Sequence, residues 1–199
     1  TVPSTYDKEP LILDAREIRG VLSNGMLASE KELALGDNHT GIIEIDKDVK
    51  PGDDFAKTYG IDNYVIDIEN KMFTHRPDCF GMLGVARELA GIQGHVFKSP
   101  AWYRVDAKIP KGNARDTHKL AAKNQLPKLV PRFCVAAMKD VVVGPSPIWL
   151  KAQLSVVGVR SVNNIVDLTN YYMLLTAQPL HAYDYDKVNS KNVRVGARE

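Results

Sequence analysis

The chain contains 199 residues, of which 44% are hydrophobic and 25% are charged, and its net charge is +2. This composition excludes wholesale disorder and leaves room for one large domain or two small ones. The net charge is too small to indicate a nucleic-acid-binding protein by itself. Cys79 and Cys134 do not form a CxxC pair, which fits a reducing compartment and gives no zinc signal. No apolar run approaches a membrane-spanning length, so we expect a cytoplasmic protein without a membrane partner.

The first fifty residues predict short elements joined by turns. LILDAREIRGVLSNGML (11–27) indicates a candidate strand that is followed by a Ser-Asn-Gly turn. Ser29, with Glu32 three residues later, forms a capping box and predicts the start of a short helix. GIIEI (41–45) is expected to form a strand.

The next segment predicts a turn, two helices and a strand. Pro51-Gly52 favours a turn before a short helix, and NYVIDIE (63–69) alternates apolar and polar residues as a half-buried strand does. THRPDCFGMLGVARELAGIQG (74–94) predicts a longer helix, with Pro77 at its first position and a closing glycine at its end. Residues 95–127 predict a linker with one short helix or strand at most.

Regular structure is predicted again in the last third. RFCVAAMKDVVVG (132–144) indicates a strand, and Ser146 with Pro147 predicts the N-cap and first residue of a helix that stops at Gly158. NVRVGA (192–197) predicts a final strand. Because strands and helices are intermixed, we expect an α+β (mixed α/β) fold with two sub-regions. The abrupt start and end of the sequence lead us to expect a piece of a longer protein.

Residues 163–175 predict a helix with a polar stripe among apolar side chains. The stripe has two readings: its groups hydrogen-bond to neighbouring loops and hold the core together, or some of them line a polar pocket. A proline ends the helix by restricting the residue before it, and the histidine in the turn that follows is either a general base or a core histidine. The residues of the stripe and of the turn after it are Asn163, Asn164, Asp167, Thr169, Asn170, Gln178, Pro179, His181 and Asp184.

Common catalytic motifs are missing from the sequence. It has no GxxxxGK[ST] phosphate loop, no GxSxG nucleophile elbow and no HExxH zinc motif, and its 5 histidines have no metal-type partner nearby. We therefore expect no metal ligands and, in a catalytic chain, a positioned water molecule instead of a covalent nucleophile. Arg132 at the head of a predicted strand either binds a phosphate or carboxylate or is simply solvated.

Three stretches together carry a family resemblance. GVLSNGMLASEKELALGDNHTGI (20–42) resembles the segment after the inserted tRNA-binding module of the bacterial phenylalanyl-tRNA synthetase β subunit. The segment 74–94 is similar to that family's "TPNRPDCLSxLGIAREVA" stretch. VGPSPIWLKAQLSVVGVRSVNNIVDLTNYYMLLTAQPLHAYDYDKV (143–188) resembles the most recognisable part of its editing domain. The resemblance runs from about residue 11 to the end and weakens at 95–127.

The resemblance implies a part in an (αβ)₂ enzyme whose α subunit holds the aminoacylation site. This β region implies a separate site that hydrolyses tyrosine wrongly attached to tRNA-Phe. The implied partners are the α subunit and tRNA-Phe, and the ATP and magnesium sites are expected elsewhere in the whole enzyme, with no cofactor in this chain. The resemblance divides the chain into a region that follows the tRNA-binding insert (1–98), a linker-like segment (99–128) and the first part of the editing domain (129–199).

The resemblance also implies the pocket. The turn after Gly158 and the helix 163–175 are expected to form one wall, with the backbone near Gly158 and Val159 facing the aminoacyl group. Arg132 and Phe133 are expected to lie opposite. The full set of candidates is Arg132, Phe133, Gly158, Val159, Asn163, Asn164, Leu175 and Thr176.

The chain departs from the family pattern at Leu175. Family members commonly carry Glu there, in a segment like MLELGQP where this chain has MLLTAQP. Leucine cannot accept a hydrogen bond from a tyrosine hydroxyl, so Thr176 would have to do so or discrimination would fall. Some family members carry His at the position of Arg132, although Arg is also common there, and His75 replaces the family's usual Asn. The alternative function is a non-catalytic, RNA-binding scaffold of the β subunit whose editing site has decayed.

Overall fold

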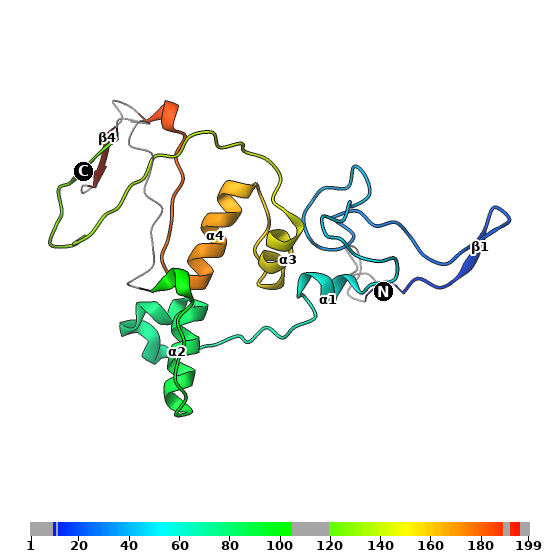
Figure 1. Cartoon of the computed structure of the whole chain (residues 1–199), viewed down its shortest axis with the longest axis horizontal. Helices are drawn as coiled ribbons and strands as arrows, with labels where there is room; N and C mark the ends of the chain where they lie inside the picture. The colour runs from blue at the N-terminus through cyan, green and yellow to red at the C-terminus, as the bar shows by residue number, and fades with distance from the viewer. Residues whose placement is uncertain (1–9, 11, 105–119, 189–191, 196–199) are drawn as a thin grey trace. The chain divides into compact units, whose positions relative to one another are not determined.

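The computed structural model describes residues 10, 12–104, 120–188 and 192–195 and confirms a mixed α+β fold (Figure 1). The chain divides into two units, which we treat separately. Unit 1 consists of Thr1–Val85 and Val143–Leu180, and unit 2 consists of Ala86–Val142 and His181–Glu199. The three predicted regions 1–98, 99–128 and 129–199 remain a prediction.

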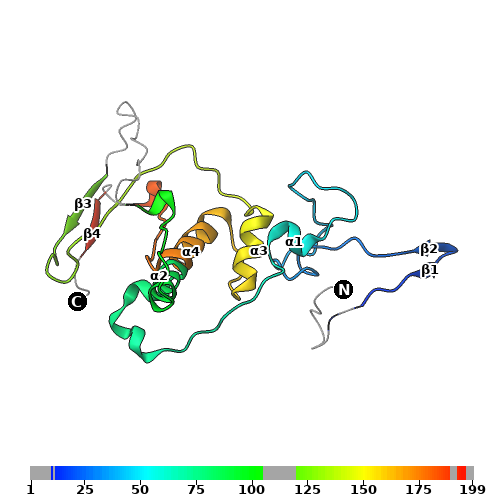
Figure 2. The same cartoon turned by 60° about the horizontal axis from the view of Figure 1, so that its bottom comes forward.

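Unit 1 is mainly helical. Its described elements are β1 (Arg16–Ile18), β2 (Val21–Ser23), α1 (Phe55–Tyr59), the 3-10 helices η1 (Lys71–His75) and η2 (Pro77–Phe80), the first residues of α2 (Met82–Ile92), α3 (Ile148–Val156) and α4 (Asn164–Thr176). Figure 2 shows α3 between α1 and α4. Unit 2 holds the rest of α2, η3 (Ala101–Tyr103), β3 (Ala121–Asn124), η4 (Tyr185–Lys187) and β4 (Asn192–Val195).

A hairpin replaces the single strand predicted at 11–27. β1 and β2 pair antiparallel with Arg16 opposite Ser23. Arg19 and Gly20 connect them with φ values of 52° and 79°. Two central residues with positive φ give a turn whose twist matches that of paired strands. The chain therefore reverses at Arg19-Gly20, before the Ser-Asn-Gly segment that the sequence favoured.

The buried core of unit 1 joins its two chain segments. Leu35 and Tyr59 from the first segment pack with Ile148 and Ala152 of α3, and all four are less than a tenth exposed. The partly buried residues around them are Leu33, Ile43, Phe55 and Ile61. Burying apolar side chains of this size stabilises a fold by about 1.5–3 kcal/mol each. The position of α3 therefore depends on residues that lie far away in the sequence.

Polar contacts fix α3 at its start and in its middle. Tyr59 Oη donates to Asp46 Oδ1 at 2.5 Å, and the amide of Ile148 donates to Asp46 Oδ2 at 3.3 Å. Lys151 Nζ lies 2.6 Å from Glu30 Oε1, with side chains only 7% and 19% exposed. Asp46 thus accepts from the first turn of α3, where a helix has unpaired N–H groups.

The structure corrects the predicted start of α3. The N-cap residue is Pro147, whose side chain makes no capping bond, and the helix begins at Ile148. Ser146 instead donates its hydroxyl to Asp167. The predicted stop is confirmed, because Gly158 has φ 74° and Val159 donates back to the carbonyl oxygen of Leu154 at 2.9 Å.

The capping box at Ser29 forms without a helix. Ser29 N donates to Glu32 Oε2 at 2.7 Å, and Glu32 N donates to Ser29 Oγ at 3.3 Å. The chain then turns back at Ala34, which has φ 56°, and Leu35 donates to the carbonyl oxygen of Glu30. The prediction of a helix was wrong, because Ala34 is in the left-handed conformation and ends the helical turn before a second one can form.

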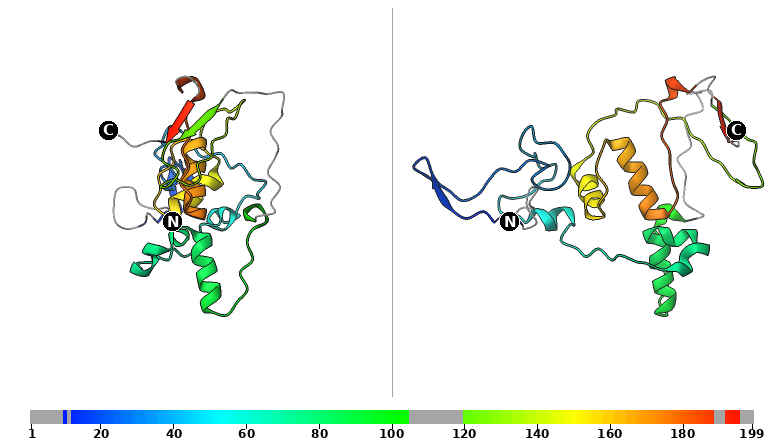
Figure 3. Two further views of the ribbon diagram at one scale, coloured as in Figure 1. Left: turned by 90° about the vertical axis from the view of Figure 1, so that its left-hand side faces the viewer. Right: turned by 180° about the vertical axis from the view of Figure 1, so that it is seen from behind.

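Three predicted strands are absent from the described chain. Residues 41–45, 63–69 and 132–144 contain no strand, and Tyr64 is 93% exposed. Residues 129–142 run as a ribbon without helix or strand (Figure 3). A strand needs a neighbour that supplies hydrogen-bond partners. Among the described residues these segments have no such neighbour, so they do not form a sheet despite their alternating pattern.

The helix predicted over 74–94 is divided into shorter helices. Pro77 begins η2, as expected of a first-position proline, but the α-helix itself starts only at Met82. The break lies at Gly81, whose backbone is extended with φ −125° and ψ 153°, and a Cβ there would lie 2.4 Å from the amide nitrogen of Ala177 at the end of α4. The predicted glycine stop is confirmed: Gly94 has φ 70° and His95 donates to the carbonyl oxygen of Ala90.

Unit 2 contains the predicted final strand. β4 pairs in parallel with β3, with Ala121 opposite Asn192 and Asn124 opposite Val195, and Figure 2 shows the two strands side by side. The last two residues of the predicted strand, 196–197, lie outside the described residues. The prediction of at most one short element within 95–127 was wrong, because η3 and β3 both lie there.

Candidate functional site

Helix α4 begins with an asparagine cap. Asn163 has extended backbone angles, and its Oδ1 accepts from the amides of Ile165 and Val166 at 3.1 and 3.0 Å. An asparagine in this geometry satisfies N–H groups that have no partner within the helix. The Asn163 oxygen, predicted as a pocket group, is therefore used by its own helix.

Asn164 ties α4 to the segment before α3. Its amide donates to the carbonyl oxygen of Gly144 at 2.9 Å, and its Oδ1 accepts from the amide of Gly144 at 3.2 Å. These two bonds resemble the paired hydrogen bonds between neighbouring strands, except that one acceptor is a side-chain oxygen. This supports the structural reading of Asn164.

Asp167 is the most buried polar residue of the stripe, with an exposed fraction of 0%. Its Oδ2 accepts from Ser146 Oγ and from Ser161 Oγ, each at 2.5 Å, and its Oδ1 accepts from Val162 N at 2.9 Å. Hydrogen bonds to an ionised acceptor are roughly twice as strong as neutral ones. One carboxylate therefore holds the chain before α3 and the chain after α3 against α4.

We define the exit loop as residues 157–162, which connect α3 to α4. At its start the amides of Gly158 and Val159 donate to Ser155 and Leu154 of α3. At its end Val162 donates to Asp167. Within the described part of the chain, the carbonyl oxygens of Gly158 and Val159 receive no hydrogen bond. The exit loop is thus fixed at both ends and offers acceptors, not donors, at the two predicted pocket positions.

Arg160 projects from the exit loop toward solvent. Its guanidinium lies 2.9 Å from Asp37 Oδ2, and the two side chains are 74% and 72% exposed. Exposed ion pairs of this kind contribute about 0–1 kcal/mol. The buried carboxylate of Asp167, and not this pair, is the main polar support of the exit loop.

Leu175 and Thr176 lie at the end of α4. Leu175 is half-buried, and Thr176 is 3% exposed. The Thr176 hydroxyl donates to the carbonyl oxygen of Tyr172 at 2.8 Å and accepts from the amide of Gln178 at 3.2 Å. Thr176 therefore uses its hydroxyl to close the helix, which ends at Ala177 with φ 60°.

The remaining stripe and turn residues have local contacts. Thr169 donates to the carbonyl oxygen of Val166 in its own helix at 2.6 Å. Asn170 is half-buried on α4, and Gln178 and Pro179 are exposed at the end of unit 1. In unit 2, the ring of His181 lies 4.4 Å from that of Tyr183.

Asp184 caps η4 in unit 2 by accepting from the amide of Asp186 at 3.1 Å. Arg132 and Phe133 also belong to unit 2, where both are exposed. The other six candidates belong to unit 1, but they lie in the exit loop and at the two ends of α4, which are about 18 Å apart along the helix. All eight pocket assignments stay predictions.

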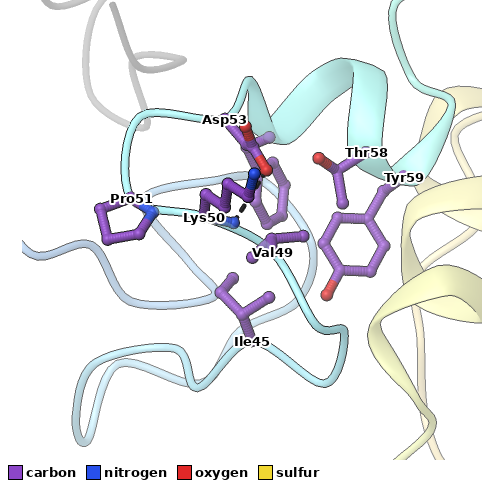
Figure 4. Close-up of a pocket in the computed structure, with 8 residues that line it drawn as sticks. Ile45, Val49, Lys50, Pro51, Asp53, Thr58 and Tyr59 are labelled. Carbon is purple, nitrogen blue, oxygen red and sulfur yellow. Dashed lines mark hydrogen bonds between the residues drawn. The ribbon is translucent and has the colours of Figure 1, made fainter.

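Two cavities open in unit 1 away from these residues. Figure 4 shows the first, of about 330 Å³, where Lys50, Asp53 and Tyr59 are among the lining side chains and the Lys50 amide donates to Asp53 Oδ2 at 2.8 Å. The second, of about 400 Å³, is lined by residues that include Phe73 and Cys79. None of the candidate pocket residues lines either cavity.

Two features are absent from the described ranges. No group of three or more His, Cys, Asp or Glu side chains is placed there to hold a metal ion. No helix in those ranges is long and apolar enough to cross a membrane.

The sequence did not reveal the partners of the stripe. Ser146 and Ser161 lie 21 and 6 residues from Asp167, and neither spacing belongs to a helix pattern. Asp46, which accepts from the start of α3, lies 102 residues from Ile148. A buried carboxylate needs donors, so an Asp among the apolar side chains of the helix was a signal that such partners exist.

Comparison with known proteins shows which families the sequence resembles. Residues 129–199 match the B3/4 domain. The chain is 41% identical over 170 residues to the phenylalanine–tRNA ligase β subunit of Syntrophus aciditrophicus, covering 85% of this chain and 20% of the relative. It is 35% identical over 196 residues to the β subunit from Symbiobacterium thermophilum, covering 98% of this chain and 21% of that relative. The β subunit from Bdellovibrio bacteriovorus is 39% identical over 178 residues, with 89% and 21% covered.

The chain spans about a fifth of the length of these curated relatives. The matches extend over most of its residues and include both segments of unit 1. Over most of its residues the chain is similar to phenylalanine–tRNA ligase β subunits, and its residues 129–199 match the B3/4 domain.

Proposed function

We propose that this chain contributes the editing region of a phenylalanine–tRNA ligase β subunit, which hydrolyses tyrosine mischarged onto tRNA-Phe. The observation that carries the proposal is the exit loop, which is fixed at both ends while Gly158 and Val159 keep their carbonyl oxygens without donors in the described chain. An aminoacyl ester carries an α-ammonium group, and carbonyl oxygens are suitable acceptors for it. The match of residues 129–199 to the B3/4 domain supports the same reading.

A separate hydrolytic site answers a chemical need. Phenylalanine and tyrosine differ by one hydroxyl, and an apolar pocket rejects an added hydroxyl only weakly. A second site that hydrogen-bonds the hydroxyl selects tyrosine and spares the correct product. In the proposed reaction, water attacks the ester carbonyl carbon, the bond to the ribose oxygen breaks, and that oxygen takes up a proton to give free tyrosine and tRNA-Phe.

The chain itself positions the substrate in this proposal. No nucleophilic side chain is required, because a water molecule held by pocket groups and by the terminal hydroxyls of the tRNA performs the attack. We further propose that the chain acts with an α subunit in the cytoplasm and that ATP and magnesium bind elsewhere in the whole enzyme.

The rival function is a non-catalytic scaffold that holds β-subunit modules against the α subunit and tRNA. Leu175 favours it, because an apolar side chain replaces the acceptor expected for a tyrosine hydroxyl. The contacts of Thr176 also favour it, since its hydroxyl is buried and engaged with Tyr172 and Gln178.

Hydrolysis of Tyr-tRNA-Phe and Phe-tRNA-Phe by the complete αβ enzyme separates the two functions. Selective release of tyrosine by the native enzyme supports editing and shows that another group reads the hydroxyl. No release by the native enzyme, with a gain in the Leu175→Glu variant, supports the scaffold. Leu168→Glu is the matched control, because it adds the same charge to α4 at a position that is 47% exposed.

A further inference from the structure

The exit loop has a support whose effect on the proposed reaction can be tested separately. Asp167 contacts the loop through two groups, the Ser161 hydroxyl and the Val162 amide. It also contacts Ser146, which precedes α3 and lies outside the loop. The carboxylate is completely buried, so solvent does not compete for its lone pairs.

We propose that Asp167 is a positioning residue for ester hydrolysis, acting by fixing the exit loop beside the aminoacyl group. The inference rests on the proposed editing function. Its physical basis is that a catalytic surface must be held to well under 1 Å, and misplacement on the order of 1 Å lowers rates about 100-fold. Asp167 needs no contact with substrate for this role.

The two serines provide a matched pair of variants. Ser146→Ala and Ser161→Ala each remove one hydroxyl that donates to the same oxygen of Asp167 at the same distance of 2.5 Å. A purely structural role for Asp167 makes the two changes equivalent. A positioning role makes them differ, because only Ser161 lies in the exit loop.

Kinetics of the complete αβ enzyme give the first test. We expect Asp167→Asn to lower kcat for Tyr-tRNA-Phe hydrolysis about 10- to 100-fold with KM changed less than about threefold. We expect Ser161→Ala to lower kcat about tenfold, Ser161→Thr to restore most of it, and Ser146→Ala to stay within about twofold of the native enzyme. Equal losses in the two alanine variants, or a change in melting temperature alone, overturn the inference.

Hydrogen exchange on the 199-residue chain gives the second test. An alanine has no acceptor atom, so it serves neither the Val162 amide nor the two serine hydroxyls. We expect Asp167→Ala to speed exchange at the Val162 amide about tenfold relative to the Val159 amide, which is held by Leu154 in the same loop.

The two measurements keep the two proposals apart. A native enzyme without Tyr-tRNA-Phe hydrolysis refutes the editing function, and exchange at Val162 then decides whether Asp167 fixes the loop. An unchanged exchange ratio overturns the positioning role even in an enzyme that edits.

Discussion

Two glycines of α2 should respond in opposite ways to the same substitution. A Cβ at Gly84 would lie 1.9 Å from the carbonyl oxygen of Asp78, 2.3 Å from its carbonyl carbon and 2.9 Å from the amide nitrogen of Cys79. These are backbone atoms of η2, so they cannot rotate away as a side chain could. A Cβ at Gly91 has no such neighbour within 4 Å.

The expected magnitudes follow from these distances. Gly84→Ala requires η2 to move by about 1 Å, and such overpacking costs typically 1–3 kcal/mol, of which about 1 kcal/mol is offset by the better helix propensity of alanine. Gly91→Ala gains that propensity alone and should stabilise the chain by roughly 0.5–1 kcal/mol. We therefore expect the two unfolding free energies to differ by about 2 kcal/mol.

Urea unfolding followed by far-ultraviolet circular dichroism measures both variants. The midpoint for Gly84→Ala should fall and that for Gly91→Ala should rise, with little change in slope. Equal midpoints for the two variants would refute the close approach of α2 to η2. A lower midpoint for Gly91→Ala would show that its surroundings are more crowded than described.

Three further predictions concern the charged and titrating groups of unit 1. Burial and the Asp46 hydrogen bond raise the pKa of Tyr59 from 10.0 to about 12. The stabilisation that this hydroxyl gives below pH 10 should therefore be lost as the pH rises from 10 to 12. Ultraviolet titration should show one late phenolate, and its absence would contradict the buried hydroxyl. Hydrogen bonds from Ser29 lower the pKa of Glu32. The capping box should therefore contribute stability above the ordinary pKa of 4.5, and this stability should be lost as the pH falls through the lowered pKa. NMR titration of the Glu32 carboxyl checks this, and a midpoint at or above 4.5 counts against it. Lys151→Met should destabilise the chain by about 2–4 kcal/mol, because it leaves the Glu30 carboxylate without its partner. Arg160→Met, which breaks an exposed ion pair, should cost less than about 0.5 kcal/mol. Chemical denaturation of both variants tests whether burial causes the difference.

Local sequence rules predicted the ends of the helices well. Gly158 and Gly94 as helix stops, and the turn and helix after Pro51, are all present in the structure. Each depends on a few neighbouring residues, because caps and left-handed stops are satisfied within one turn of the chain. The position of α4 was therefore available from the sequence.

Predictions that required a distant partner failed or stayed incomplete. The segments 63–69 and 132–144 have the alternation of strands, but pairing depends on another strand that the pattern does not identify. Ser146 was predicted as the N-cap of α3, yet its hydroxyl donates to Asp167. The amide of Ile148 at the start of α3 donates to Asp46 instead. Of the pocket candidates, Asn163 and Asn164 proved to brace α4, which the sequence could not separate from a ligand-binding role.

The discontinuity of unit 1 has a consequence for protein synthesis. Leu35 and Tyr59 must wait for Ile148 and Ala152 before their core can close. Glu30 and Lys151 are 121 residues apart, which a ribosome adding roughly 5–20 residues per second takes about 6–24 s to complete. During that interval the apolar side chains of the first segment are exposed on the nascent chain. This is the period in which chaperone binding, or a pause in translation, would most affect the yield of folded protein.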